Sequence, residues 1–133
     1  MRVMIDTNII ISAMLFPRGR AAQAFFKTLY PPYQPLVCDY IVEEIYKKFK
    51  EKFSDRRRAL EAFQADILPR ISVVSTPKEE SLAENAIRDP KDRPILRAAL
   101  NVHADLLLTG DKDFLESSLI DPRIIGVAEY LEM

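Results

Sequence analysis

Short apolar runs alternate along this chain with longer segments in which apolar residues recur at helical spacing. The runs occupy Arg2–Ile5, Leu36–Cys38, Ile71–Val74, Leu106–Leu108 and Ile124–Val127. Short apolar runs bounded by polar or turn residues are typical of buried strands. Five strands separated by helical segments predict an α/β fold, a three-layer α/β/α sandwich around a mostly parallel sheet.

The spacing of apolar residues also predicts the helices. The clearest helix follows Asp92, where positions i, i+3, i+4 and i+7 are filled by Ile95, Ala98, Ala99 and Val102. Asp39 and Asp92 stand where helix N-caps belong, and Pro94 falls in a first turn, where proline removes no internal hydrogen bond. Further helices are expected over residues 9–15, 21–29, 39–53, 54–67, 79–87 and 128–131.

Length and composition bound the class of protein. The chain has 133 residues and no linker or repeat, so we expect a single domain over 1–133 with a sizeable core. One cysteine, Cys38, excludes an intramolecular disulfide framework and fits a reducing cytosol. No apolar run has transmembrane length, and Asp6 interrupts the N-terminal one. We therefore expect a cytoplasmic protein without a signal peptide or membrane contact.

The distribution of charge is more informative than the net charge of −1. Between Lys47 and Arg58 the chain carries seven basic residues against Glu51 and Asp55. Such a segment is either a solvated helix face or an arm that meets a polyanion, and its composition does not distinguish the two.

Acidic side chains stand at the ends of predicted strands. Asp6 follows the first strand, Asp111 and Asp113 follow the fourth, and Asp92 precedes the helix between the third and the fourth. Ligands of open α/β sheets gather at the carboxyl ends of strands, so one cleft can receive all of these groups. Each aspartate taken alone could be an N-cap or a turn residue. That interpretation does not explain why acids follow both the first and the fourth strands.

Clustered carboxylates have a definite chemistry. They raise one another's pKa unless a cation neutralises them. Oxygen donors without histidine or cysteine suit Mg²⁺ or Mn²⁺, and such ions activate water and stabilise a departing oxygen. The pattern therefore predicts metal-assisted hydrolysis of a phosphate ester.

Three segments, MIDTNIIISAML, VCDYIVEEIYKKF and RDPKDRPILRAAL…ADLLLTGDKDFL, resemble the PIN domain. The resemblance runs from Val3 to Leu131 and is greatest to the small VapC-type ribonucleases, the toxins of toxin–antitoxin pairs. It implies the α/β/α sandwich and an Mg²⁺- or Mn²⁺-dependent endoribonuclease that hydrolyses RNA phosphodiester bonds by metal-activated water. It also implies an antitoxin protein as partner and a homodimer.

The same resemblance assigns site residues. The acids that bind the metal and carry catalysis are Asp6, Glu44, Asp92 and Asp111. Auxiliary roles fall to Asn8, which supports Asp6 through a side-chain hydrogen bond, to Thr109, which orients the site, and to Asp113.

Two of these assignments have competitors. The helical wheel does not choose between Glu43 and Glu44, and Glu44 is taken because it fits the family pattern. Asp89 competes with Asp92, although its place before Pro90 is typical of a turn residue.

Basic residues near the expected site are candidates for RNA contact. They are Lys47, Lys48, Arg18 and Arg20. The two arginines flank the break after the first helix, and we expect them to lie close to Asp6. For Arg18 and Arg20 the alternative is plain solvation.

Other functions remain as alternatives. A PIN nuclease of RNA processing that is not a toxin and a catalytically silent PIN-fold interaction domain share the fold. A phosphatase of the haloacid-dehalogenase kind would need an aspartate where Asn8 stands. A response-regulator receiver would need its acids and lysine in another order.

Overall fold

The computed structural model describes all 133 residues, and its centre is a five-stranded sheet. The strands are β1 (Arg2–Ile5), β2 (Gln34–Cys38), β3 (Ser72–Val74), β4 (Leu106–Leu108) and β5 (Arg123–Ile125). All neighbours are parallel and the order is β3-β2-β1-β4-β5. The predicted α/β class with a parallel sheet is confirmed.

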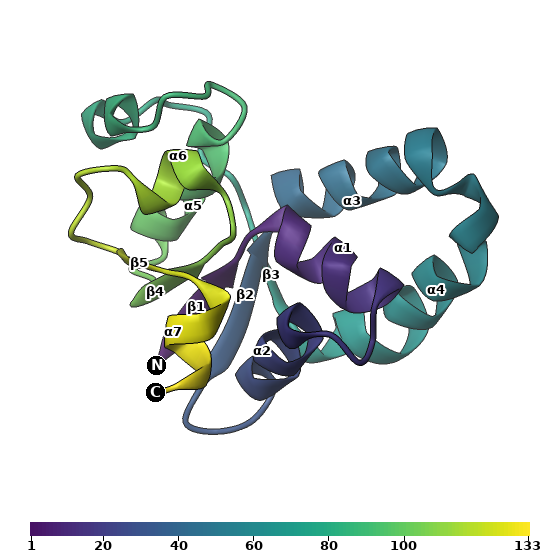
Figure 1. Ribbon diagram of the computed structural model, residues 1–133. Coiled ribbons are helices and arrows are strands. Elements are labelled where there is room, and N and C mark those ends of the chain that lie inside the picture. The colour runs from purple at the N-terminus through teal and green to yellow at the C-terminus, as the bar shows by residue number, and fades with distance from the viewer.

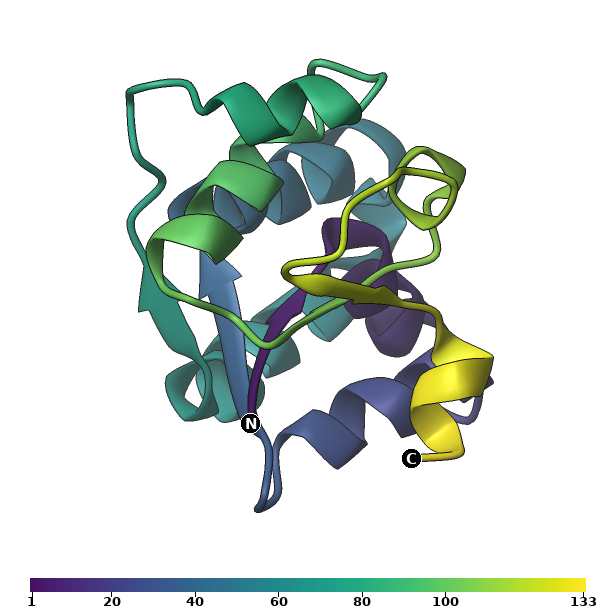
Figure 2. The same ribbon diagram turned by 90° about the vertical axis from the view of Figure 1, so that its left-hand side faces the viewer.

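Helices cover both faces of the sheet (Figure 1). The chain runs outward from β1 to β3 and then crosses back to β4 and β5. Because parallel crossovers are right-handed, the crossover helices before β3 cover one face and those between β3 and β5 cover the other. In Figure 2 α5, in green, lies nearer the viewer than α3, in blue. The direction of winding changes between β1 and β4, and α/β sheets bind ligands at such a point.

The helices have unequal lengths. The first layer holds α1 (Thr7–Leu15), α2 (Arg20–Thr28), α3 (Asp39–Lys52) and α4 (Arg57–Ala62). The second holds α5 (Arg93–Asn101) and α6 (Lys112–Leu115), and α7 (Val127–Leu131) packs against α2. Single turns are η1 (Ser54–Arg56), η2 (Phe63–Ile67), η3 (Leu68–Arg70) and η4 (Leu82–Ala86). No helix is long and apolar enough to span a bilayer.

One hydrophobic cluster of 30 buried residues joins the sheet to both layers. Leu106, Leu107 and Leu108 are all buried because β4 has helices on both faces. Ile41, Ile45 and Phe49 recur at helical spacing and pack one face of α3 into the same core. This burial fixes the strand and helix ends that carry the acidic residues.

Three local predictions differ from the structure. The helix expected over 79–87 is only the 3₁₀ turn η4, which Ser81 caps through reciprocal bonds with Glu84 and Ala83. Asp39 is the first residue of α3, and the N-cap is Cys38; the Asp39 Oδ1 accepts the N–H groups of Tyr40 and Thr76. The helix expected over 54–67 is divided among η1, α4 and η2.

Candidate active site

Acidic side chains from four separate segments meet at the carboxyl ends of β1 and β4. Asp6 follows β1, Glu44 lies in the second turn of α3, Asp92 precedes α5 and Asp111 follows β4. Asp6 is 3% exposed. A cleft of about 630 Å³ opens beside the other three, lined by Asn8, Tyr40, Glu43, Glu44, Lys47, Lys48, Glu51, Lys52, Asp89, Lys91, Asp92 and Asp111.

Both carboxylate oxygens of Asp6 are held in place. Oδ1 accepts the backbone N–H of Thr7 at 2.7 Å, which caps α1, and Oδ2 accepts the hydroxyl of Thr109 at 2.7 Å. Burial raises the pKa of Asp6 to about 6; these two bonds oppose that rise, and the charges of Asp111 and Glu44 add to it. Asp6 is thus a rigid carboxylate in a negative environment.

The hydroxyl of Thr7 ties Glu44 to the end of β1. Thr7 Oγ1 donates to Glu44 Oε1 at 2.6 Å, and the Glu44 side chain is half-buried. Glu43 also lines the cleft but is exposed. The geometry therefore points Glu44, rather than Glu43, toward Asp6. Sequence reasoning assigned Thr7 no role, because nothing local links it to a residue 37 positions away.

Asp92 and Asp111 are neighbours with different surroundings. Asp111 caps α6 by accepting the N–H of Asp113 at 2.8 Å, and its own N–H donates to Thr109 Oγ1 at 3.0 Å. Asp92 stands at the N-cap position of α5 but caps nothing, and its Oδ2 is buried without a hydrogen-bond partner. Burial, and then the adjacent Asp111 carboxyl, raise the pKa of Asp92 to about 8. Capping explains Asp6 and Asp111 but not Asp92.

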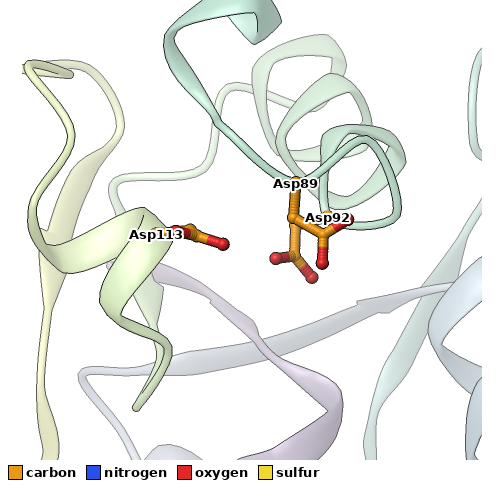
Figure 3. Close-up of side chains that lie close together, drawn as sticks. All are labelled: Asp89, Asp92 and Asp113. Carbon is orange, nitrogen blue, oxygen red and sulfur yellow. The ribbon is translucent and has the colours of Figure 1, made fainter.

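A second acidic grouping shares Asp92. Oxygens of Asp89, Asp92 and Asp113 lie within 4.8 Å of one another, with Asp113 approaching from α6 (Figure 3). Asp89 makes the predicted turn, since its Oδ1 accepts the N–H of Lys91 at 3.0 Å, and it belongs to this grouping too. Asp113 also pairs with Arg88 at 3.2 Å. The orphaned oxygen of Asp92 and the carboxylate oxygens gathered around it fit a hard divalent cation.

The side chain of Asn8 does not support Asp6 as expected. Both oxygens of Asp6 are occupied by Thr7 and Thr109, and Asn8 Oδ1 instead accepts from Lys48 Nζ at 3.1 Å. Asn8 therefore connects α1 to the basic side of the cleft.

The cleft receives some of the expected basic residues and not others. Lys47 and Lys48 line it, together with Lys52 and Lys91, which sequence reasoning had not singled out. The expectation that Arg18 and Arg20 lie close to Asp6 is wrong. They follow α1, whose nine residues extend about 13 Å away from its N-terminal end.

A family model described as the PIN domain matches residues 2–113. Among solved structures, the chain is similar to VapBC2 from Rickettsia felis bound to a DNA fragment from their promoter, with 15% identity and a TM-score of 0.70 over 95% of this chain and 98% of that one. It is also similar to DNA-bound VapBC from Salmonella typhimurium, with 17% identity and a TM-score of 0.68 over 96% and 98% of the two chains.

The structure of FitAcB from Neisseria gonorrhoeae has 15% identity and a TM-score of 0.68, over 95% of this chain and 98% of that one. At these identities the likeness shows the fold. A comparison with curated protein sequences finds no significant match.

Proposed function

This chain belongs to the PIN domain family, and we propose that it is a divalent-metal-dependent endoribonuclease and the toxin of a toxin–antitoxin pair, acting as a single domain over 1–133. The observation that carries the proposal is the buried, unpartnered oxygen of Asp92 beside Asp111. None of the four acids, Asp6, Glu44, Asp92 and Asp111, forms an ion pair with a basic side chain. An uncompensated carboxylate cluster calls for a cation from outside the chain.

The four acids would hold Mg²⁺ or Mn²⁺, with Asp89 and Asp113 at the edge of the site. A bound ion of this kind supplies Lewis-acid stabilisation of phosphate charge and eases deprotonation of an attacking water. The aspartates and Glu44 supply the negative charge that retains it.

Other residues of the chain orient these acids and attract the substrate. Thr109 holds Asp6, and Thr7 holds Glu44, so two ligands keep fixed directions without a bound ion. Four lysines at the cleft can neutralise phosphates on either side of the scissile bond; they are Lys47, Lys48, Lys52 and Lys91. Phosphate contacts position a strand without reading its sequence. The substrate we propose is an RNA loop or a single strand, whose unstacked bases are open to side chains.

An antitoxin partner and a homodimer complete the proposal. Two of the similar structures are VapBC complexes bound to DNA, with which this chain shares its fold over nearly its whole length. An antitoxin segment whose acidic side chains bind the lysines of the cleft would restrain the nuclease until it is released.

The decisive experiment is cleavage of a labelled, structured RNA in Mg²⁺, in Mn²⁺ and in EDTA by the wild type and by Asp6→Asn. The amide is nearly isosteric but supplies no ligand charge, and several kcal/mol of lost stabilisation corresponds to a rate loss of about 10³-fold or more. Asp66→Asn is the matched control, since Asp66 is exposed on η2 and lies outside the cleft.

We expect cleavage with either ion, none in EDTA, a loss in Asp6→Asn and full activity in Asp66→Asn. The cut ends should carry a 5′-phosphate and a 3′-hydroxyl. Full activity in Asp6→Asn would contradict the assignment of Asp6 as a metal ligand. If no variant cuts and calorimetry shows no Mn²⁺ binding by the wild type, the chain is an interaction domain that has kept the fold.

A further inference from the structure

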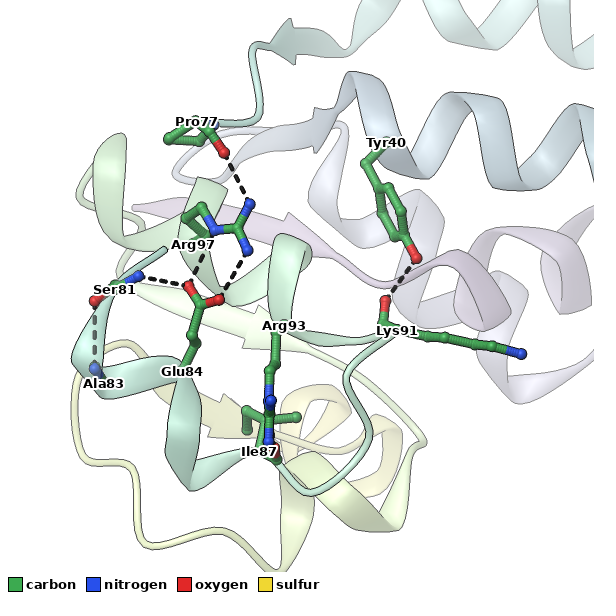
Figure 4. Close-up of polar contacts among 9 residues, drawn as sticks. All are labelled: Tyr40, Pro77, Ser81, Ala83, Glu84, Ile87, Lys91, Arg93 and Arg97. Atoms are coloured by element: carbon green, nitrogen blue, oxygen red, sulfur yellow. Dashed lines mark hydrogen bonds and ion pairs between the residues drawn. The ribbon is translucent and has the colours of Figure 1, made fainter. Parts of the chain in front are cut away.

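The acidic cleft has two walls, and a single side-chain hydrogen bond joins them. Tyr40 lies in the first turn of α3, and its hydroxyl donates to the backbone carbonyl of Lys91 at 2.7 Å (Figure 4). Lys91 immediately precedes Asp92. Glu44 lies four residues after Tyr40 on the same face of α3. One turn of α3 therefore carries both an acid of the site and the group that reaches the opposite wall.

The segment that carries Asp89 and Asp92 is held from its other side as well. Arg93 Nε donates to the carbonyl of Ile87 at 2.9 Å, which closes the segment into a loop between these two residues. Behind it, Arg97 makes a two-pronged contact with Glu84 at 2.8 and 3.0 Å (Figure 4). Residues 87–92 lie in no strand or α-helix. The buried side chain of Ile87 anchors one end of this loop in the core and α5 follows the other end, and the bonds from Tyr40 and Arg93 hold the part between them.

We infer that Tyr40 and Arg93 are positioning residues that set the separation between Glu44 and Asp92 across the cleft, and with it the affinity for the metal. The inference rests on the proposed function, because it gives these residues a role toward the same site. Tyr40 acts through the Lys91 carbonyl and Arg93 through the Ile87 carbonyl, so neither needs to touch the ion or the RNA.

The surroundings of Tyr40 suit this role. Its side chain is half-buried, lines the cleft and packs against the edge of the buried cluster, so Tyr40→Phe keeps the packing of the ring and removes only the hydroxyl. Burial, and then the charges of Glu44 and Asp92, raise the pKa of Tyr40 to about 12. The phenol therefore stays protonated and remains a donor at neutral pH.

The test is Mn²⁺ binding by calorimetry without RNA, comparing the wild type with Tyr40→Phe and Tyr46→Phe. Tyr46 is the matched control, because it lies half-buried on the same helix and outside the cleft. Groups that orient metal ligands typically account for 10- to 100-fold in affinity. We expect Tyr40→Phe to weaken Mn²⁺ binding about tenfold and Tyr46→Phe to leave it unchanged.

A second variant and a second readout separate positioning from direct contact. Arg93→Lys keeps the charge but removes the Nε donor, and should weaken Mn²⁺ binding in the same direction. In RNA cleavage, Tyr40→Phe should raise the Mn²⁺ concentration at half-maximal rate by the same factor, while the rate at saturating Mn²⁺ recovers.

The outcomes distinguish this inference from the proposed function. Wild-type affinity for Mn²⁺ in Tyr40→Phe overturns the positioning role and leaves the nuclease proposal standing. A raised KM for RNA with unchanged Mn²⁺ affinity overturns it in favour of a direct RNA contact. A wild-type protein that neither binds Mn²⁺ nor cuts RNA overturns both.

Discussion

Two regions of this molecule bury carboxylates, and they treat the charge in opposite ways. Glu84 in η4 is 2% exposed and accepts bonds from the Arg97 guanidinium and the backbone of Ser81. The bond from Arg97 lowers the pKa of Glu84. In the cleft, burial without a cation raises the pKa of Asp6 to about 6 and that of Asp92 to about 8.

The contrast separates a structural charge from a functional one. A buried carboxylate paired with a guanidinium is satisfied within the chain and fastens η4 to α5. Buried carboxylates gathered without a cationic partner destabilise the metal-free fold, and a bound cation would remove that cost. Arg97→Met and Asp92→Asn should therefore shift the free energy of unfolding in opposite directions.

Arg97→Met should produce the largest loss of stability. It leaves Glu84 as an uncompensated buried charge, and breaking such a pair from one side typically costs about 3–5 kcal/mol in the free energy of unfolding. Urea denaturation measures the loss. Arg123→Met is the control, because Arg123 pairs with Glu129 at the surface, where a salt bridge contributes about 0–1 kcal/mol. Equal losses in the two variants would show that the Glu84 pair has no special structural role.

The pH dependence of the two regions should also be opposite. The lowered pKa of Glu84 contributes stability above its unfolded value, and this contribution is lost in acid. The raised pKa values of Asp6 and Asp92 mean that the folded, metal-free protein binds protons that the unfolded chain has released. The contribution of these two groups to the free energy of unfolding therefore falls as the pH rises from about 4, toward about 6 for Asp6 and toward about 8 for Asp92.

Asp92→Asn should consequently stabilise the metal-free protein while abolishing cleavage. Asp92 is half-buried, so solvent screening keeps the expected gain at pH 8 in EDTA to about 1 kcal/mol, a rise in melting temperature of roughly 3 °C. The gain should shrink as the pH is lowered toward 4. Adding Mn²⁺ at 100 times its Kd should stabilise the wild type by about 2.7 kcal/mol and the variant far less.

Thermal melts of the wild type and of Asp92→Asn measure these changes in stability. Asp66→Asn is the control, because Asp66 is exposed. A lower melting temperature for Asp92→Asn in EDTA at pH 8 would contradict the view of Asp92 as an uncompensated charge.

The sheet and most of the acids could be predicted from the sequence because both depend on local patterns. Short apolar runs specify buried strands, and an acid after a strand must lie at its carboxyl end whatever the rest of the fold does. Asp6 and Asp111 follow from this rule and Asp92 from the family motif, and the structure brings the three to one edge of the sheet.

The remainder depends on contacts between distant segments. The bond from Tyr40 to Lys91 spans 51 residues and the bond from Thr7 to Glu44 spans 37, so no local pattern reveals either. The helical spacing over 79–87 failed for the same reason. Glu84 turns inward to Arg97 and back to the Ser81 N–H, and the helix is reduced to one turn.

Thr7→Val should give the smallest change, and it tests whether orientation within the cleft matters apart from charge. The substitution keeps the β-branched shape and removes the hydroxyl that donates to Glu44, leaving all four acids in place. Loss of one such bond costs about 1 kcal/mol or less in the free energy of unfolding. Cleavage at subsaturating Mn²⁺ should fall about three- to tenfold because Glu44 loses its fixed direction.

Thr28→Val removes a buried hydroxyl that donates to the Phe25 carbonyl in α2, far from the cleft. Thr28→Val should lose as much stability as Thr7→Val and leave cleavage unchanged. Equal activity in the two variants would mean that Glu44 is oriented by the metal alone, and that the cleft needs only the charge of its acids.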